Sequence, residues 1–235
     1  MKKILIIIAT MMSLTTYAEG EGRHEMHAFY FLNVTNPIGV VNALDEFAAS
    51  DCGKKLPADV GLMAEAVNGS SESTHFIIVS YENMGDFTKA GQLLQSCPEG
   101  AKMFQGLASS SEAVSEFAFI PAIEVGDWTK DNVFMRYEIK TSNEAAYASA
   151  WTELMDSNVA DGSVTGSYGL NRIFLGNNEA SHFVYIGAKD FESLVANQNT
   201  STTSPAFEKF SRKVGTLREV LNTTLVFPVK SWPKQ

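Results

Sequence analysis

The stretch Ser73–Ser80, STHFIIVS, places a histidine at the start of an apolar run, and Ala180–Gly187, ASHFVYIG, repeats the arrangement. His75 and His182 are 107 residues apart. Sliding the chain against itself by this distance, without a gap, aligns further identical residues. These include Tyr30 with Tyr137, Gly69 with Gly176, Pro98 with Pro205 and Pro121 with Pro228. Because one register superimposes turn residues and helix breakers together, the pattern indicates an internal duplication.

The hydrophobic periods of each copy predict the order βαββαβ. In the first copy we expect strands at 27–34, 60–67, 75–81 and 116–123, and helices at 37–51, 84–96 and 98–113. In the second copy we expect strands at 133–140, 166–175, 182–188 and 223–229, and helices at 143–157, 190–197 and 205–220. The pair Asn36-Pro37 is a helix start signal. Each copy is therefore predicted to form a four-stranded antiparallel sheet with helices on one face.

The other face of the first sheet must also be covered, because Phe29 and Phe31 would lie on it. Leaving a phenylalanine in water forfeits about 1.5–3 kcal/mol relative to burial. The predicted fold class is α+β, with two ferredoxin-like βαββαβ repeats whose antiparallel sheets pack face to face as a pseudo-dimeric α+β barrel.

This arrangement resembles the tandem dimeric α+β barrel superfamily. The resemblance rests on His75-Phe76 and His182-Phe183 at the third strands and on Pro98 and Pro205 within the second helical segments. That superfamily includes antibiotic-biosynthesis monooxygenase-like, NIPSNAP-like, EthD-like and chlorite dismutase-like proteins. No residue motif selects one of these families.

The first 18 residues, MKKILIIIATMMSLTTYA, are typical of a bacterial signal peptide cleaved after Ala18. We expect a periplasmic or secreted protein with a signal peptide at 1–18 and repeats at 19–125 and 126–235. No later segment is apolar enough to cross a membrane, so we expect no membrane insertion after cleavage. The formal net charge of −9 argues against nucleic acid as a partner.

Cys52 and Cys97 are the two cysteines of the chain, and we expect them to form a disulfide in an oxidising compartment. A metal or nucleophilic cysteine is the alternative, but no CxxC motif supports it. We also expect no metal site, because no HxH, HxxxH or HExxH spacing occurs.

The candidate catalytic residues are His75, His182, Tyr30 and Tyr137. The histidines could act as general bases near neutral pH. A structural position at the start of each strand explains both copies equally well and is favoured. The tyrosines could donate a proton or anchor a substrate, although a tyrosine at the core edge is the more ordinary interpretation.

The candidate ligand-binding residues are charged and would share one sheet face: Arg136, Glu138, Arg172 and Glu65. Buried charges must pair with each other or contact a polar ligand. We favour a salt-bridge network between the two sheets over an anion-binding cavity.

Two functions from different classes remain. One is an exported protein that binds a small organic molecule without catalysis, which we favour. The other is a cofactor-independent monooxygenase-like enzyme acting on a small aromatic or hydrophobic substrate. We expect no cofactor. The resemblance to chlorite dismutase-like proteins implies haem on His182 as the less favoured alternative. We expect a monomer, because the duplication supplies an internal pseudo-dimer.

Overall fold

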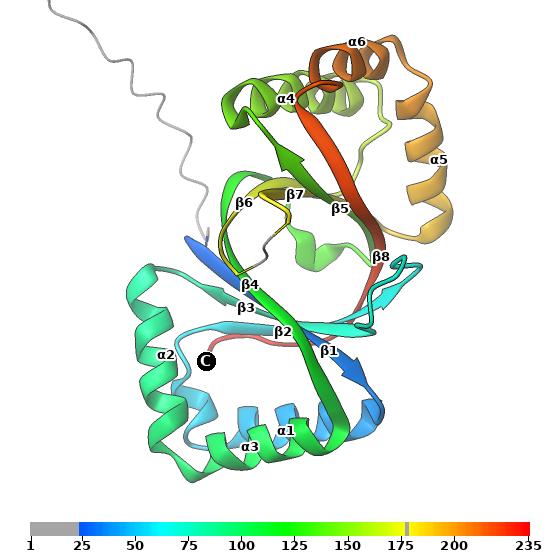
Figure 1. The fold of residues 1–235 in the computed structure, drawn as a ribbon. Coiled ribbons are helices and arrows are strands. Elements are labelled where there is room, and N and C mark those ends of the chain that lie inside the picture. The colour runs from blue at the N-terminus through cyan, green and yellow to red at the C-terminus, as the bar shows by residue number, and fades with distance from the viewer. Residues whose placement is uncertain (1–23, 177–178) are drawn as a thin grey trace, which may run out of the picture.

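A computed structural model describes residues 24–176 and 179–235. The predicted signal peptide therefore lies outside the described residues. A β-barrel occupies the centre of the molecule, with one layer of helices at each end (Figure 1). The first repeat contains β1 (Met26–Val34), α1 (Pro37–Ala49), η1 (Gly53–Lys55), β2 (Asp59–Ala66), β3 (His75–Tyr81), α2 (Met84–Ser96), α3 (Pro98–Ser110) and β4 (Ser111–Val125). The second contains η2 (Trp128–Lys130), β5 (Val133–Thr141), α4 (Glu144–Ala160), β6 (Tyr168–Gly176), β7 (His182–Ala188), α5 (Phe191–Thr202), α6 (Pro205–Val214) and β8 (Arg218–Trp232).

The first helix of each repeat begins at an asparagine cap. The side chain of Asn36 accepts a hydrogen bond from the backbone N–H of Gly39, and that of Asn143 accepts one from Ala146. These bonds satisfy N–H groups that have no partner within the helix. The predicted start signal at Asn36 is thus confirmed, and its counterpart works in the same way 107 residues later.

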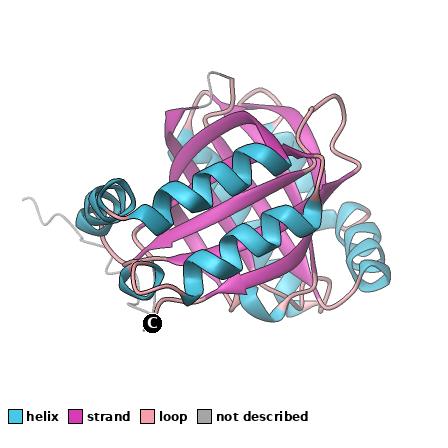
Figure 2. Cartoon of the chain, turned by 90° about the horizontal axis from the view of Figure 1, so that it is seen from below, coloured by secondary structure: helices cyan, strands magenta, loops and turns pink. Residues whose placement is uncertain are grey.

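The strands close into one barrel in the order β1-β3-β2-β8-β5-β7-β6-β4. Two long strands join the repeats. The first part of β4 pairs with β1 and its second part with β6. Likewise, β8 pairs first with β5 and then with β2. The predicted α+β fold with a pseudo-dimeric barrel is confirmed, and the helices lie across the outer face of the strands (Figure 2).

The predicted ends of the last helix in each repeat are wrong. Helix α3 ends at Ser110 rather than near residue 113, and α6 ends at Val214 rather than near 220. Val220 instead lies in β8, where it is 44% exposed. The apolar spacing at 214–220 fits a helix. From Arg218 onward, however, the backbone pairs with β5, so its hydrogen bonds are made within the sheet.

The barrel interior is an aromatic core that contains residues from both repeats. Its phenylalanines are Phe29, Phe31, Phe76, Phe117, Phe119, Phe134 and Phe183. Phe29 of the first repeat lies 5.4 Å from Phe183 of the second, measured between ring centroids. The expected burial of Phe29 and Phe31 between the sheets is therefore confirmed, with both side chains at most 5% exposed.

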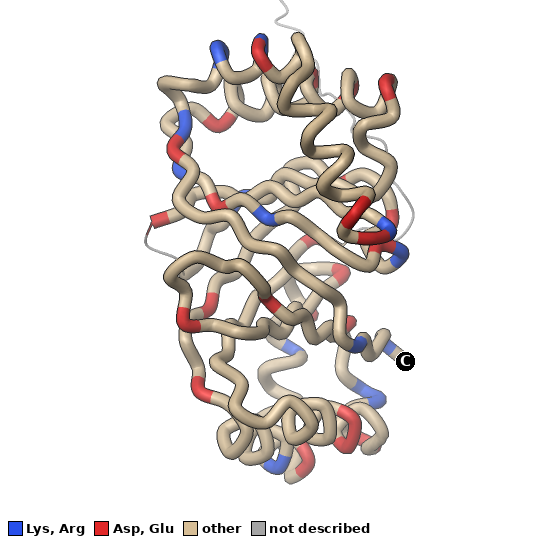
Figure 3. Tube along the Cα trace, turned by 90° about the vertical axis from the view of Figure 1, so that its right-hand side faces the viewer, with Lys and Arg blue, Asp and Glu red and all other residues tan. Residues whose placement is uncertain are grey.

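The charged residues are distributed over the whole molecule, with Lys and Arg scattered among Asp and Glu (Figure 3). Within residues 24–176 and 179–235, no helix is long and apolar enough to cross a membrane.

Candidate functional site

A cavity of about 540 Å³ lies between the sheet of the first repeat and its helices. Helix α1 contributes Leu44 and Phe47 to its wall, and α3 contributes Met103 and Leu107. Ile77 of β3 forms part of the floor. Its lining is predominantly apolar, and its volume lies within the range of about 300–1,000 Å³ that is usual for small-molecule sites.

A pair of tyrosines supplies a polar group within this apolar cavity. Tyr30 and Tyr81 both line the cavity, and their phenol groups lie close enough to influence each other. Burial raises the pKa of Tyr30, and the nearby carboxylate of Glu116 raises it further. Burial also raises the pKa of Tyr81. Both phenols therefore remain protonated at neutral pH and are suited to hydrogen bonding rather than to accepting a proton.

The end of the second repeat completes the wall of this cavity. Trp232 donates from Nε1 to Asp45 Oδ1 at 2.8 Å. The backbone N–H of Lys234 donates to Asp59 Oδ1 at 2.7 Å, and its Nζ lies 2.9 Å from Glu82 Oε1. The C terminus accordingly lies beside β2 and α2 of the first repeat (Figure 1). Trp232 and Lys234 both line the cavity, so its wall requires both repeats.

The corresponding layer of the second repeat has larger side chains at three positions. At the positions 107 residues after Val40, Leu44 and Met103, the chain has Tyr147, Trp151 and Phe210. All three are at most 3% exposed and pack in one core cluster. Tyr147 and Phe210 lie in edge contact, with ring centroids 6.0 Å apart. The two copies therefore pack differently at these positions. Other lining positions show the opposite change, such as Phe47 against Leu154 and Tyr81 against Ala188, so side-chain volumes in the sequence do not locate the cavity.

The two histidines occupy equivalent positions but different environments. His75 is half-buried, with Nδ1 2.9 Å from Thr74 Oγ1, and burial lowers its pKa. His182 is 4% exposed, with Nδ1 2.9 Å from Ser181 Oγ. Burial lowers the pKa of His182, and the Glu144 carboxylate opposes this effect. The distance of 3.6 Å from Nε2 of His182 to Glu144 Oε1 is too long for a hydrogen bond.

The structure does not combine the predicted histidines and tyrosines in one site. Among the described residues that line the large cavity, Tyr30 occurs but His75 does not. In the second repeat the Tyr137 hydroxyl donates to Met135 Sδ at 2.6 Å. Burial raises the pKa of Tyr137 to about 12, although the charge of Arg218 lowers it in part. Tyr81, which the sequence did not single out, is the residue that joins Tyr30.

Three of the four predicted charged residues meet inside the barrel. Arg136 Nη2 lies 2.8 Å from Glu65 Oε1 and 3.2 Å from Glu138 Oε1. The Ser73 hydroxyl donates to the other oxygen of Glu65 at 2.5 Å. The side chains of Arg136 and Glu65 are 5% and 1% exposed. The pair thus bridges β5 of one repeat and β2 of the other.

Aromatic rings surround this buried cation. The guanidinium of Arg136 lies 5.0 Å from the ring centroid of Phe31 and 5.3 Å from that of Phe76. Its Nε and Nη1 have no hydrogen-bond partner, and a cavity of about 70 Å³ adjoins the residue. A space of this size has room for a few water molecules, which would satisfy these donors.

Arg172 does not join the cluster, contrary to the expectation. It is exposed and lies opposite His182 in the pairing of β6 with β7. Leu62 and Leu170, which are 108 residues apart, both face the helices. The second strands of the two copies are therefore offset by one residue from the ungapped register, and a shift of one residue moves a strand side chain to the other face.

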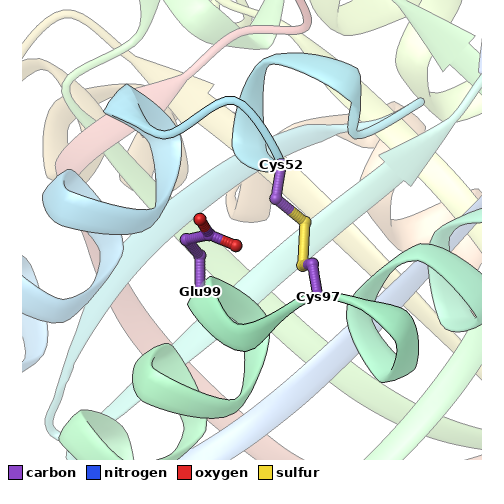
Figure 4. Close-up of side chains that lie close together, drawn as sticks. All are labelled: Cys52, Cys97 and Glu99. Atoms are coloured by element: carbon purple, nitrogen blue, oxygen red, sulfur yellow. A yellow bond between two sulfur atoms is a disulfide. The ribbon is translucent and has the colours of Figure 1, made fainter.

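The cysteines form a disulfide beside the large cavity. Cys52 is bonded to Cys97, with Glu99 nearby (Figure 4). The carboxylate of Glu99 and the two sulfur atoms lie within 4.8 Å of one another. Because the sulfurs are bonded to each other, they form a cross-link and are not thiolate ligands. Gly53, the next residue after Cys52, lines the cavity, so the disulfide holds part of its wall.

Comparison with known proteins identifies similarity in fold. No protein-family model matches the chain, and no curated protein matches it in sequence. A proposed monooxygenase from Lactobacillus acidophilus superimposes with a TM-score of 0.60 at 7% identity, over 90% of this chain and 97% of that one. An anthrone oxidase-like protein gives 0.60 at 8% identity, over 89% and 93%. A haem-binding protein from Thermus thermophilus gives 0.51 at 8% identity, over 88% and 92%.

The expectation that no cofactor is involved is corrected by this comparison. Proteins that share the fold include one described as haem-binding, so the architecture gives no reason to exclude haem. His182 is 4% exposed, and the core of the same sheet–helix layer contains Tyr147, Trp151 and Phe210. An absorption spectrum of protein purified from its own host tests for haem directly.

The similar structures cover most of this chain and most of their own chains, at low sequence identity. Such similarity establishes the fold and selects no single family. The chain has the fold of the dimeric α+β barrel proteins, with both halves of the barrel in one polypeptide.

Proposed function

We propose that this protein binds a small, predominantly apolar organic molecule in the cavity of the first repeat. The observation that carries the proposal is the difference between the repeats. One sheet–helix layer holds a cavity of about 540 Å³, whereas Tyr147, Trp151 and Phe210 pack together in the core of the equivalent layer of the other. A cavity of this size within a close-packed fold loses van der Waals contacts, and a bound ligand would restore them.

A monooxygenase-like reaction is the second candidate. Two features favour it, namely the similarity in fold to a protein described as a monooxygenase and the hydroxyls of Tyr30 and Tyr81 in the cavity wall. Raised pKa values suit these phenols as proton donors or anchors but not as general bases. Binding alone is therefore better supported. Mass spectrometry of the ligand recovered after incubation in air distinguishes the two, since an oxygenase adds the mass of oxygen.

We further propose that the protein is exported and monomeric. The disulfide between Cys52 and Cys97 supports an oxidising compartment. The closed barrel supports a monomer, because β4 and β8 already pair with both repeats. Intact-mass measurement of the periplasmic protein should give a chain that begins at Glu19, and light scattering should give the mass of one chain.

Binding is tested with the fluorescent probe N-phenyl-1-naphthylamine, whose emission increases in apolar sites. We expect saturable binding by the wild-type protein. Leu107→Trp places a larger side chain in the cavity and should weaken binding by at least about tenfold. Gln105→Trp is the matched control, because Gln105 lies on the exposed side of the same helix. Equal binding by both variants would show that the probe binds elsewhere.

A further inference from the structure

The cavity wall offers almost no positive charge. Its ionisable side chains are Tyr30, Tyr81, Glu116 and Lys234. The ammonium group of Lys234 lies 2.9 Å from Glu82 Oε1 and is thus already paired. Glu116 brings a negative charge to the mouth of the cavity, opposite Tyr30 in the pairing of β4 with β1. An anionic ligand would find no free cation among the described lining residues.

The tyrosine pair offers at least one hydrogen-bond donor to a ligand. Tyr30 and Tyr81 both line the cavity and each carries one O–H, so an O–H remains for a ligand even where the two phenols interact. A carbonyl or ether oxygen can accept it. An ionised carboxylate would also accept it, but desolvation of the charge without an opposite charge costs far more than one hydrogen bond returns.

We propose that the cavity selects uncharged ligands that carry a hydrogen-bond acceptor, such as aromatic or alicyclic ketones, and rejects carboxylates of the same shape. This inference rests on the proposed binding function. It narrows the ligand class to neutral molecules and excludes fatty acids and aromatic acids.

Two naphthalene derivatives of nearly equal shape test the proposal. 2-Acetylnaphthalene carries a methyl ketone, and 2-naphthoate carries a carboxylate in its place. Both compete with bound N-phenyl-1-naphthylamine, and the loss of its fluorescence gives their affinities. At pH 7.5 we expect the ketone to bind at least about tenfold more tightly than the acid.

Variants locate the source of the preference. The double variant Tyr30→Phe/Tyr81→Phe removes both hydroxyls and should lower the affinity for 2-acetylnaphthalene by about fivefold. Tyr137→Phe is the matched control in the second repeat and should leave the affinity unchanged. Glu116→Lys introduces a cation in the cavity wall. This variant should reduce the difference in affinity between 2-acetylnaphthalene and 2-naphthoate.

Each outcome bears on the proposal. Equal affinities, or tighter binding of 2-naphthoate, would overturn the selectivity and leave the proposed binding function intact. Failure of the wild-type protein to bind N-phenyl-1-naphthylamine would overturn both. A tenfold preference that is unchanged in both Tyr30→Phe/Tyr81→Phe and Glu116→Lys would show that the selectivity arises outside this cavity and would also overturn the proposal.

Discussion

Replacement of the buried cation Arg136 tests how the two halves of the barrel are held together. Arg136→Met keeps a long side chain among the phenylalanines and removes the charge. The variant leaves the Glu65 carboxylate in the barrel interior with its hydrogen bond from the Ser73 hydroxyl. Because the side chain of Glu65 is 1% exposed, water cannot replace the lost guanidinium without entering the core.

The expected loss follows from this burial. Breaking a buried ion pair by removal of one partner costs about 3–5 kcal/mol in the free energy of unfolding. Typical domains unfold with about 5–15 kcal/mol, so Arg136→Met should remove a large fraction of the total. The second partner, Glu138, is 18% exposed, and Glu138→Gln should cost only about 1 kcal/mol. The double variant Arg136→Met/Glu65→Gln removes both charges and should be more stable than Arg136→Met alone.

Urea unfolding followed by fluorescence and by circular dichroism measures these differences. A double-mutant cycle over Arg136 and Glu65 should give a coupling energy of about 1–3 kcal/mol. Coincident transitions for the two probes and an unchanged slope with urea would show that the comparison is valid. A loss below about 1 kcal/mol for Arg136→Met, or additive effects in the cycle, would refute a stabilising bridge between the repeats.

Three further predictions concern pH, the cross-link and the histidines. Burial, aided by the charge of His24, lowers the pKa of His27 to about 3. The unfolded chain therefore binds a proton below pH 6.5 that the folded chain excludes, and this residue should lower the free energy of unfolding by about 2 kcal/mol at pH 5. Urea unfolding at several pH values should show a shallower decline for His27→Phe, and equal declines would contradict this. Cys52→Ser/Cys97→Ser opens a loop with a sequence separation of 45 residues and should cost about 4 kcal/mol by thermal unfolding, with weaker probe binding. An unchanged melting temperature would argue against the cross-link. His182→Ala should cost about 2 kcal/mol and His75→Ala less than about 1 kcal/mol, because only His182 is buried, and the reverse order would be inconsistent with the structure.

The duplication and the order of elements could be predicted because their signals are local. Asn36 caps the first helix through its own side chain, and Pro98 begins α3 where the sequence interrupts the helical period. Gly69 and Gly176 lie at the matched turns with φ values of 68° and 72°, a conformation that favours glycine. These signals depend on a few neighbouring residues, so the sequence displays them without knowledge of the fold.

The boundaries and the site depended on contacts between distant segments. The change from α6 to β8 follows pairing with β5, and the exposure of Arg172 follows a shift of one residue within β6. Tyr81 joins Tyr30 only because β1 and β3 are adjacent in the barrel. A histidine–tyrosine site was expected from matched sequence positions, whereas the described cavity is lined by two tyrosines.

The sequence by itself determined that two βαββαβ units occur in one chain, because periodicity, caps and turn residues act over short distances. Only the tertiary structure decided where the cavity of about 540 Å³ lies. Leu44 and Met103 leave space that Trp151 and Phe210 fill in the other copy, and Trp232 reaches the first repeat from the end of the second. Whether such side chains fill or leave a space depends on the distance between sheet and helices, which the packing of the whole chain sets.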